Sequence, residues 1–273
     1  MDWFDKFPQL SASSLVYFKS KIDNLFFSFS ASHGEAIENF FEPLLYFLIF
    51  VEKLLVQTPW VLILFVTILI SYFVSKSFKL TIAIVLGLCC IGLIGLWEDT
   101  MKTLSIILVA TFICIIVGVP IGTLLHNRNF LQKIVNPVLD LMQTIPTFVY
   151  LIPIITLMGI GKVPGLIAVC VYSVPPVIRL TSLGLKQVPH RYVETAMALG
   201  LTRLKILLMI KFPMALQSIL VGINQMIGVS GLGSNILKAI NNQYITTGLL
   251  NGFAIVVIAI ILDRLFQSII KRK

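Results

Sequence analysis

Long apolar runs, separated by short polar segments, make up most of the chain from about residue 58 onward. A helix needs about 20 mostly apolar residues to span the hydrocarbon core of a bilayer, and membrane helices tolerate the Gly and Pro found inside some of these runs. The pattern predicts about seven membrane-spanning helices. They are Thr58–Val74, Leu80–Trp97, Leu104–Leu125, Ile145–Ile160, Val163–Gly184, Phe212–Val229 and Thr247–Leu262.

The first 57 residues follow a different pattern. Met1–Glu42 is polar and mixed, and it lacks the basic start, short apolar core and small-residue cleavage site of a targeting peptide, so we expect it to be retained. Pro43–Val56 is apolar but short and carries Glu52 and Lys53, which predicts an interfacial helix leading into the first span. The chain thus divides into an N-terminal tail, residues 1–57, and a membrane domain, residues 58–273.

Composition supports the same class. The 273 residues are 58% hydrophobic and only 12% charged, and the mean hydropathy is +0.97. These values lie far outside the usual make-up of a soluble domain. The sequence therefore predicts an all-α integral membrane protein, a polytopic helical bundle.

Basic residues orient this bundle, because Lys and Arg accumulate in short cytoplasmic loops. With the N-terminus outside, an odd number of spans places the C-terminus inside. The inner segments then hold fourteen basic and three acidic residues: Lys76, Lys79, Arg128, Lys133, Arg179, Lys186, Arg191, Arg203, Lys205, Lys211, Arg264, Lys271, Arg272 and Lys273 against Asp140, Glu194 and Asp263. This bias makes the N-terminal tail extracytoplasmic and accounts for the net charge of +9 without nucleic acid.

The chain shows no arrangement of residues typical of catalysis or metal binding. Cys89, Cys90, Cys114 and Cys170 all fall within predicted spans without paired spacing, which favours packing roles. The three histidines lie in loops without a second ligand at helical spacing. We expect no catalytic residues, no metal and no cofactor.

A basic segment, RYVETAMALGLTRLKILLMIKFPMA at residues 191–215, separates the fifth and sixth predicted spans. Pro189 can lie in a first helical turn, Gly200 can end that helix, and Thr202 can cap the next one. The segment therefore predicts a helix, a turn and a second helix on the cytoplasmic side.

The first of these helices carries a small, shallow apolar face. Val193, Ala196, Met197 and Gly200 follow i, i+3, i+4, i+7 spacing. Such a face suits a groove on another protein. Periodicity alone equally allows it to pack on the second helix of the loop or on the membrane surface.

Within this segment, ETAMALGLTRLKILLMIKFP resembles the EAA loop of ABC importer permeases: Glu-Ala-Ala, three residues, Gly, nine residues, then Ile-x-Leu-Pro. Glu194, Ala196, Gly200, Ile210 and Pro213 match in register, whereas Thr195 and Phe212 replace consensus residues conservatively. The resemblance implies that the loop, about residues 185–213, docks into a cleft of a separate cytoplasmic ATPase subunit and transmits its nucleotide-driven closure.

Other stretches are similar to the permeases of glycine betaine, proline betaine and choline importers. They are residues Val138–Pro189, GINQ at Gly222–Gln225, GLG at Gly231–Gly233 and AIILDRL at Ala259–Leu265. The resemblance covers roughly Trp97 to the end of the chain and implies a transport subunit of the bacterial cytoplasmic membrane. It also implies a second permease copy, a homodimer, and an extracytoplasmic substrate-binding protein whose aromatic rings surround a quaternary ammonium group. The chain lacks Gly-x-x-x-x-Gly-Lys-Ser/Thr, so ATP hydrolysis is expected of the ATPase partner and this chain is not an enzyme.

Several polar residues lie in or beside predicted spans, where an unpaired polar group is costly. We expect these residues either to line a wet pathway or to form hydrogen bonds between helices. They are Gln143, Thr147, Tyr150, Asn224 and Gln225.

Two other functions stay open at this point. The EAA loop is shared across substrate classes, so the chain could belong to an importer of another small solute, such as an amino acid. An intramembrane enzyme is disfavoured because no nucleophile, base or metal arrangement lies at membrane depth.

One departure from the family affects the sixth span. In the family a long apolar run separates the Asn-Gln pair from the glycine-rich outer turn, whereas here GINQMIGVSGLG joins Gln225 to Gly228 almost directly. About a dozen residues are absent, roughly 18 Å of helix, and Phe212–Val229 would reach only about 27 Å. We therefore expect this chain to insert and to bind its ATPase but to transport poorly.

Overall fold

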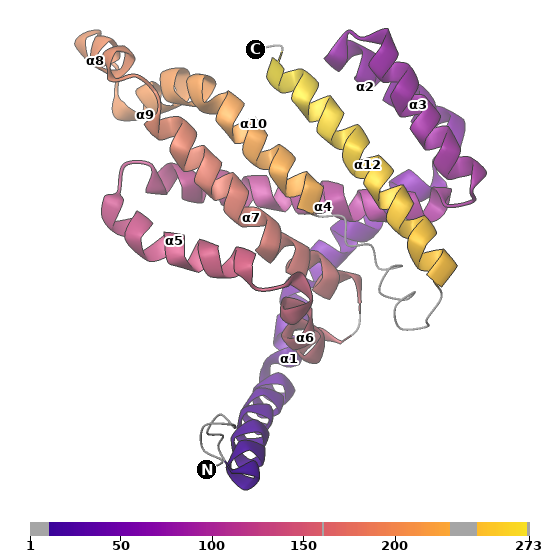
Figure 1. Ribbon diagram of the computed structural model, residues 1–273. Helices are drawn as coiled ribbons and strands as arrows, with labels where there is room; N and C mark the ends of the chain where they lie inside the picture. The colour runs from indigo at the N-terminus through magenta and orange to yellow at the C-terminus, as the bar shows by residue number, and fades with distance from the viewer. Residues whose placement is uncertain (1–10, 160, 230–244, 272–273) are drawn as a thin grey trace, which may run out of the picture.

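The computed structural model describes residues 11–159, 161–229 and 245–271, and its regular elements there are all helical (Figure 1). They are α1 (Ala12–Gln57), α2 (Trp60–Ser75), α3 (Phe78–Leu93), α4 (Trp97–Leu125), α5 (Asn129–Thr144), α6 (Thr147–Met158), α7 (Lys162–Lys186), α8 (His190–Ala198), α9 (Arg203–Ile206), the π-helix η1 (Leu207–Lys211), α10 (Phe212–Val229) and α12 (Ile245–Lys271). The predicted all-helical class is confirmed.

Four of these helical segments are long and apolar enough to cross a membrane: α4, α7, the run Arg203–Ile227 and Gly248–Ile270 of α12. Two strongly bent pairs, α1 with α2 and α5 with α6, bring the number to six if each pair is one span, and α3 is a shorter apolar helix. Each of the seven predicted runs coincides with a helix, so the count of about seven is compatible with the structure.

The N-terminal segment corrects our prediction of a short helix over Pro43–Val56. A single helix, α1, runs through Pro43 for 46 residues, about 69 Å at the α-helical rise. Contacts on both sides of the proline hold it: Ser30 Oγ donates to the Thr156 carbonyl at 2.8 Å, and Leu48 is fully buried. The N-terminal half of α1 extends away from the bundle (Figure 1). The mixed pattern of residues 12–42 concealed this helix, because only part of its length packs on other helices.

We predicted no helix for the segment between the third and fourth predicted spans. It forms α5, whose apolar residues recur with helical spacing and pack on the core: Leu131, Val135, Leu139 and Met142. The chain then bends by 91° into the short helix α6. Pro146 explains the break, because a proline disfavours helical geometry at the preceding residue, and Ile145 is extended with ψ 126°.

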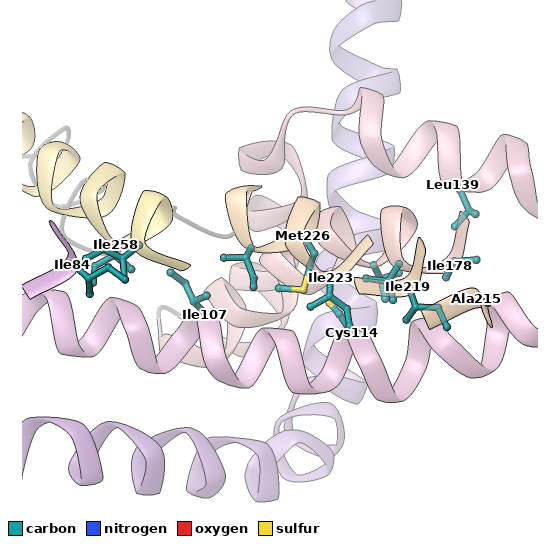
Figure 2. Close-up of a cluster of buried hydrophobic side chains, with 14 of the residues drawn as sticks. Ile84, Ile107, Cys114, Leu139, Ile178, Ala215, Ile219, Ile223, Met226 and Ile258 are labelled. Atoms are coloured by element: carbon teal, nitrogen blue, oxygen red, sulfur yellow. The ribbon is translucent and has the colours of Figure 1, made fainter. Parts of the chain in front are cut away.

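Helices α4, α7 and α10 form the centre of the core, and α3, α5 and α12 pack around them (Figure 2). Glycines let the backbones of α4 and α7 approach closely, as is typical of membrane helices. A Cβ on Gly122 would lie 2.6 Å from the Ile178 carbonyl oxygen and 2.7 Å from Thr181 Cβ. Cys114 is buried in this core and Cys170 packs against it, in agreement with the packing role predicted for them.

Candidate functional site

The predicted helix-turn-helix lies at one end of the molecule, where α8 and α9 project beyond the bundle (Figure 1). Pro189 is the residue before α8, with φ −59° and ψ 133°. Gly200 has φ +77°, a conformation that L side chains rarely adopt. The N–H of Leu201 donates to the Ala196 carbonyl at 3.0 Å, and that of Gly200 to the Met197 carbonyl at 2.9 Å. These two bonds form a Schellman motif, so Gly200 ends the helix as predicted.

The second helix of the loop begins at its predicted cap. Thr202 Oγ1 accepts from the N–H of Lys205 at 3.5 Å, and α9 passes directly into η1 and then α10. The N–H of Phe212 donates to the Leu207 carbonyl, the spacing of a π-helix. This wider turn lies immediately before Pro213, whose ring would clash with the carbonyl four residues back in a regular helix. A proline within the motif therefore shapes the joint between the loop and α10.

The apolar face of α8 divides between two environments. Ala196 is only 2% exposed and Val193 is half-buried, so part of the face packs within the loop itself. Met197 is 51% exposed, Leu199 74% and Leu204, on α9, 64%. One side of the face therefore packs within the loop, and the other side leaves apolar side chains uncovered.

The remaining residues of the motif surround this patch or follow it. Glu194 lies 2.9 Å from His190 Nδ1, one turn earlier on the same exposed face. Thr195 Oγ1 donates to the Arg191 carbonyl at 2.8 Å. Ile210 is half-buried in η1, and Pro213 is exposed at the start of α10. The motif therefore combines an exposed acidic group, a glycine turn and a proline joint over one continuous segment.

His126 connects this loop to the end of α4. Its Nδ1 lies within hydrogen-bond distance of the Thr123 carbonyl, and its Nε2 lies 3.3 Å from Lys211 Nζ, at the end of η1. With Nδ1 donating, Nε2 is the nitrogen that accepts from the ammonium group, which requires a neutral ring. Burial chiefly, together with the Lys211 charge, lowers the pKa of His126, although the bond to Thr123 acts in the opposite direction.

The candidate pathway residues on α5 and α6 lie around the bend between these helices. Tyr150 Oη donates to the Leu141 carbonyl at 3.1 Å and so ties α6 to α5. Gln143 is half-buried near the end of α5. Thr147 begins α6, but its side chain lies outside the part that the structure describes.

The candidates on α10 lie apart from this bend. Asn224 Nδ2 donates to Asp263 Oδ1 on α12 at 2.7 Å, and Gln267 Nε2 donates to both oxygens of the same carboxylate at 3.0 and 2.8 Å. Gln225 is exposed. Helix α7 lies between α5 and α10 in the bundle (Figure 1). Within one copy of the chain, α7 therefore lies between the two groups of candidate residues, and they do not form one site.

Three charged residues within the long helices α5, α7 and α12 were not among the predicted site residues. Arg179, within α7, pairs with Asp140 of α5 and also donates to the Asn136 carbonyl at 3.5 Å. Asp263 joins α12 to α10. A signal was present in the sequence: Arg179 falls inside a predicted span and Asp263 directly follows one, and ionisable residues at such positions indicate a function or a partner.

The sixth predicted span has the expected bounds, Phe212–Val229, but it does not stand alone. The helical run that includes it extends from Arg203 to Ile227, 25 residues, or about 37 Å at the α-helical rise. The added residues, Arg203–Lys211, form α9 and η1 of the predicted coupling loop, so the short reach from Phe212 onward stays a prediction. The glycine-rich turn at Gly231–Gly233 lies outside the described residues, and the effect on transport also stays a prediction.

Comparison with known proteins shows which family the chain resembles. The profile of binding-protein-dependent transport system inner membrane components matches residues 114–230. The glycine betaine/proline betaine transport system permease protein ProW of Escherichia coli is 37% identical over 240 residues, 83% of this chain and 68% of that protein. The glycine betaine permease OpuAB of Bacillus subtilis is 41% identical over 202 residues, 69% of this chain and 72% of that protein. The glycine betaine/carnitine permease GbuB of Listeria monocytogenes is 38% identical over 232 residues, 78% of this chain and 81% of that protein.

A solved structure shares the fold. An inward-facing structure of the MetNI methionine ABC transporter has a TM-score of 0.56 and 18% identity, over 64% of this chain and 94% of that chain. Membership of this family implies a multi-pass position in the inner membrane and partnership with an ATPase and a substrate-binding protein. The chain belongs to the binding-protein-dependent transport system inner membrane components, and it is a permease subunit of an ABC transporter and not an enzyme.

Proposed function

We propose that this chain is the permease of an ATP-driven importer for quaternary ammonium compatible solutes, glycine betaine, proline betaine or choline. The three relatives described above support this substrate class, because glycine betaine is common to their names and they span most of the chain. The methionine transporter shares the fold at only 18% identity, so it does not favour an amino acid as the solute.

Coupling to the ATPase runs through the loop formed by α8, α9 and η1 in this proposal. The observation that carries it is the exposed apolar patch of Met197, Leu199 and Leu204. The helices that carry this patch, α8 and α9, lie at one end of the molecule and project beyond the bundle (Figure 1). Large apolar side chains left uncovered outside the membrane are typical of a protein interface.

A second copy of the chain completes the pathway in this proposal. The side chain of Asp140 is 64% exposed and that of Arg179 is 36% exposed. Arg179 lies seven residues, about 10 Å, before the last residue of α7. Lipid contact with such an ion pair is costly, so this face of α5 and α7 turns toward water or toward the partner copy. Gln143 lies on α5 close to the same face.

The N-terminus lies outside and the C-terminus inside in this proposal. The α2–α3 turn and the C-terminal half of α12 line a common pocket, and both lie at the same end of the bundle as α8 (Figure 1). Basic residues at this end include Lys76, Arg203 and Arg264, which supports a cytoplasmic position under the positive-inside rule. In spheroplasts, protease should cleave a tag after Met1 and spare a tag after Lys273. Cleavage of both tags, or of neither, would contradict this orientation.

Two substitutions at one position test the coupling loop. Gly200→Val places a β-branched residue at φ +77°, a strain of about 1–2 kcal/mol that should lower the population of the correct loop roughly 5- to 30-fold. Gly200→Asn is the matched control, because Asn tolerates this conformation. We expect Gly200→Val, and also the charge reversal Glu194→Lys, to reduce ATPase co-purification and solute-stimulated ATP hydrolysis while membrane insertion persists. Unchanged ATPase co-purification and unchanged ATP hydrolysis in both Gly200→Val and Glu194→Lys would contradict the proposal.

Uptake into vesicles tests the substrate. Vesicles holding this chain, its ATPase and its binding protein receive labelled glycine betaine, choline or methionine in parallel. We expect ATP-dependent uptake of a quaternary ammonium solute only, and low uptake until the family-length apolar run is restored after Gln225. Uptake of methionine alone would overturn the substrate class. Strong uptake by the unrestored chain would overturn the prediction of poor transport.

A further inference from the structure

A pocket of about 410 Å³ lies between the α2–α3 turn and the C-terminal half of α12. Lys76, Ser77 and Leu80 line it from the turn and the start of α3, and Arg264, Gln267 and Ser268 line it from α12. These segments are almost 190 residues apart in the sequence, so only the fold brings them together. The pocket is separate from the coupling loop and from the face of α5 and α7 described above.

Two positive charges define the chemistry of this pocket. Lys76 and Arg264 both line it, and neither takes part in an ion pair recorded in the described part of the chain. No acidic residue is among those that line the pocket. The nearest acid in the sequence, Asp263, already accepts hydrogen bonds from Asn224 and Gln267. The pocket therefore offers an uncompensated pair of cations.

The lining hydroxyl groups have local partners and add little by themselves. Ser75 Oγ donates to the Ser71 carbonyl at 2.6 Å, and Ser268 Oγ donates to the Arg264 carbonyl at 2.6 Å. Hydroxyl oxygens with these partners still keep the walls polar. The Lys76 ammonium and the Arg264 guanidinium carry the attraction for an anion, and a guanidinium matches phosphate geometry especially well.

The backbone at Lys76 supports a role for its side chain. Lys76 has φ +49° at the C-terminal cap of α2, the one non-glycine residue with positive φ among those that the structure describes. Gly or Asn usually occupies such a cap, because a Cβ is strained there. The chain thus holds a long cationic side chain at a position where the backbone alone favours a different residue.

Exposed aromatic residues lie next to this pocket in the sequence. Phe73 is 67% exposed just before the turn, and Phe78 is 70% exposed just after it. Tyr72 is also exposed, at 49%. Exposed aromatic rings flank the ends of membrane helices at the interface with water. A lipid whose phosphate group enters this pocket can therefore place its acyl chains beside α2 and α3.

We propose that this pocket binds the phosphate group of an anionic phospholipid between Lys76 and Arg264. Basic pockets between membrane helices on the cytoplasmic side bind the headgroups of such lipids. A zwitterionic lipid fits less well, because its ammonium group would lie near two positive charges. Assignment to the inner leaflet rests on the orientation given under the proposed function, whereas the binding itself does not.

Native mass spectrometry of the purified chain in detergent tests the proposal with phosphatidylglycerol and phosphatidylcholine as probes. We expect the wild-type chain to retain phosphatidylglycerol several-fold more than phosphatidylcholine. Lys76→Asn with Arg264→Gln should abolish this preference, and Lys76→Asn alone should weaken it. Asn suits the left-handed cap, so that single variant should fold. Lys76→Arg with Arg264→Lys should preserve the preference. Lys79→Gln is the matched control, because Lys79 is exposed nearby but does not line the pocket.

Equal retention of the two lipids by the wild-type chain would overturn the proposal. The proposal also fails if the Lys76→Asn variants keep the wild-type preference or if Lys79→Gln loses it. Displacement of phosphatidylglycerol by an equal concentration of inorganic phosphate would assign the pocket to a soluble anion and overturn the lipid assignment. These measurements need neither the ATPase nor uptake, so their failure is distinguishable from failure of the proposed function.

Discussion

The two sides of α7 differ in how the chain makes contact. Toward α4 the contact is made by glycines: a Cβ on Gly118 would lie 2.8 Å from Val177 Cγ1, and one on Gly122 would meet the Ile178 carbonyl oxygen. Toward α5 the contact includes an ion pair, Asp140 with Arg179, and a hydrogen bond from Lys186 Nζ to Gln132 Oε1 at 3.0 Å.

This difference predicts different roles for the two sides of one helix. Backbones in close contact leave no room for a changed side chain, so the interface of α4 and α7 resists both substitution and movement. Exposed polar pairs contribute little to stability, and they are tolerated at membrane depth only where water or protein meets them. We infer that the interface with α4 holds the fold, whereas the side facing α5 serves transport.

Gly122→Ala should have the largest effect on folding, because the new Cβ would lie 2.6 Å from a backbone oxygen that no side-chain rotation can move. We expect a loss of about 3 kcal/mol in the free energy of unfolding, the upper end for overpacking. Gly252→Ala on α12 is the matched control, because nothing lies within 4 Å of its Cβ position, and it should be neutral or stabilising by up to about 1 kcal/mol. Denaturant titration in mixed micelles measures both, and equal values would remove the contrast.

Gly184→Ala tests the close contact of α7 with α10 and should cost less, about 1–2 kcal/mol. Its Cβ would meet Ser218 Cβ at 2.7 Å, and the nearest backbone atom, the Ala215 oxygen, is 3.2 Å away. Ser218→Gly removes the clashing atom, so the two changes together should be coupled by about 1 kcal/mol or more. If the free-energy changes of Gly184→Ala and Ser218→Gly simply add, the backbones at this interface can move apart to accept the new Cβ.

Arg179→Gln tests the polar side of α7. The ion pair with Asp140 is exposed, so the free energy of unfolding should change by less than about 1 kcal/mol. Uptake of the quaternary ammonium solute should fall much further, because the unpaired Asp140 carboxylate would hold its ammonium group. Arg179→Lys should retain most uptake. Lys102→Gln, which removes a similarly exposed pair with Glu98, serves as the control. A large loss of stability with Arg179→Gln would show that the α5 side of α7 also holds the fold, as the α4 side does.

His126, at the end of the interface of α4 and α7, should have the smallest effect and only at acidic pH. Its pKa in the folded chain is lowered, chiefly by burial. Above pH of about 6.5 the ring is neutral in both the folded and the unfolded states, so this residue adds no pH dependence. As the pH falls below that value the unfolded state binds the proton first, and stability decreases until the folded ring is protonated as well. His126→Gln should remove this decrease, as unfolding titrations between pH 5 and 7.5 would measure. An identical pH profile for both chains would exclude His126 as its source.

Much of the fold could be predicted from local pattern. The apolar runs gave seven helices close to their final positions, including Phe212–Val229 with the observed bounds. Gly200 and Thr202 predicted the turn and the cap of the coupling loop, because both act through the backbone within a few residues. The continuity of α1 through Pro43 was not predictable in this way, since it depends on contacts with α4, α6 and α7.

The candidate site shows the same division. The sequence predicted the motif from Glu194 to Pro213 and the polar candidates Asn224 and Tyr150. It could not predict the hydrogen bond of Asn224 with Asp263, 39 positions away, or the ion pair of Arg179 on α7 with Asp140 on α5.

The sequence by itself determined the membrane class, the helical runs and the turn at Gly200, because hydropathy and backbone preference act over short stretches of chain. The tertiary structure alone decided which polar groups became partners and which charges, such as those of Lys76 and Arg264, have no ion pair among the described residues. The physical reason is distance: the cost of a buried or unpaired charge depends on what lies within a few ångströms in space. In this chain those neighbours come from helices far apart in the sequence.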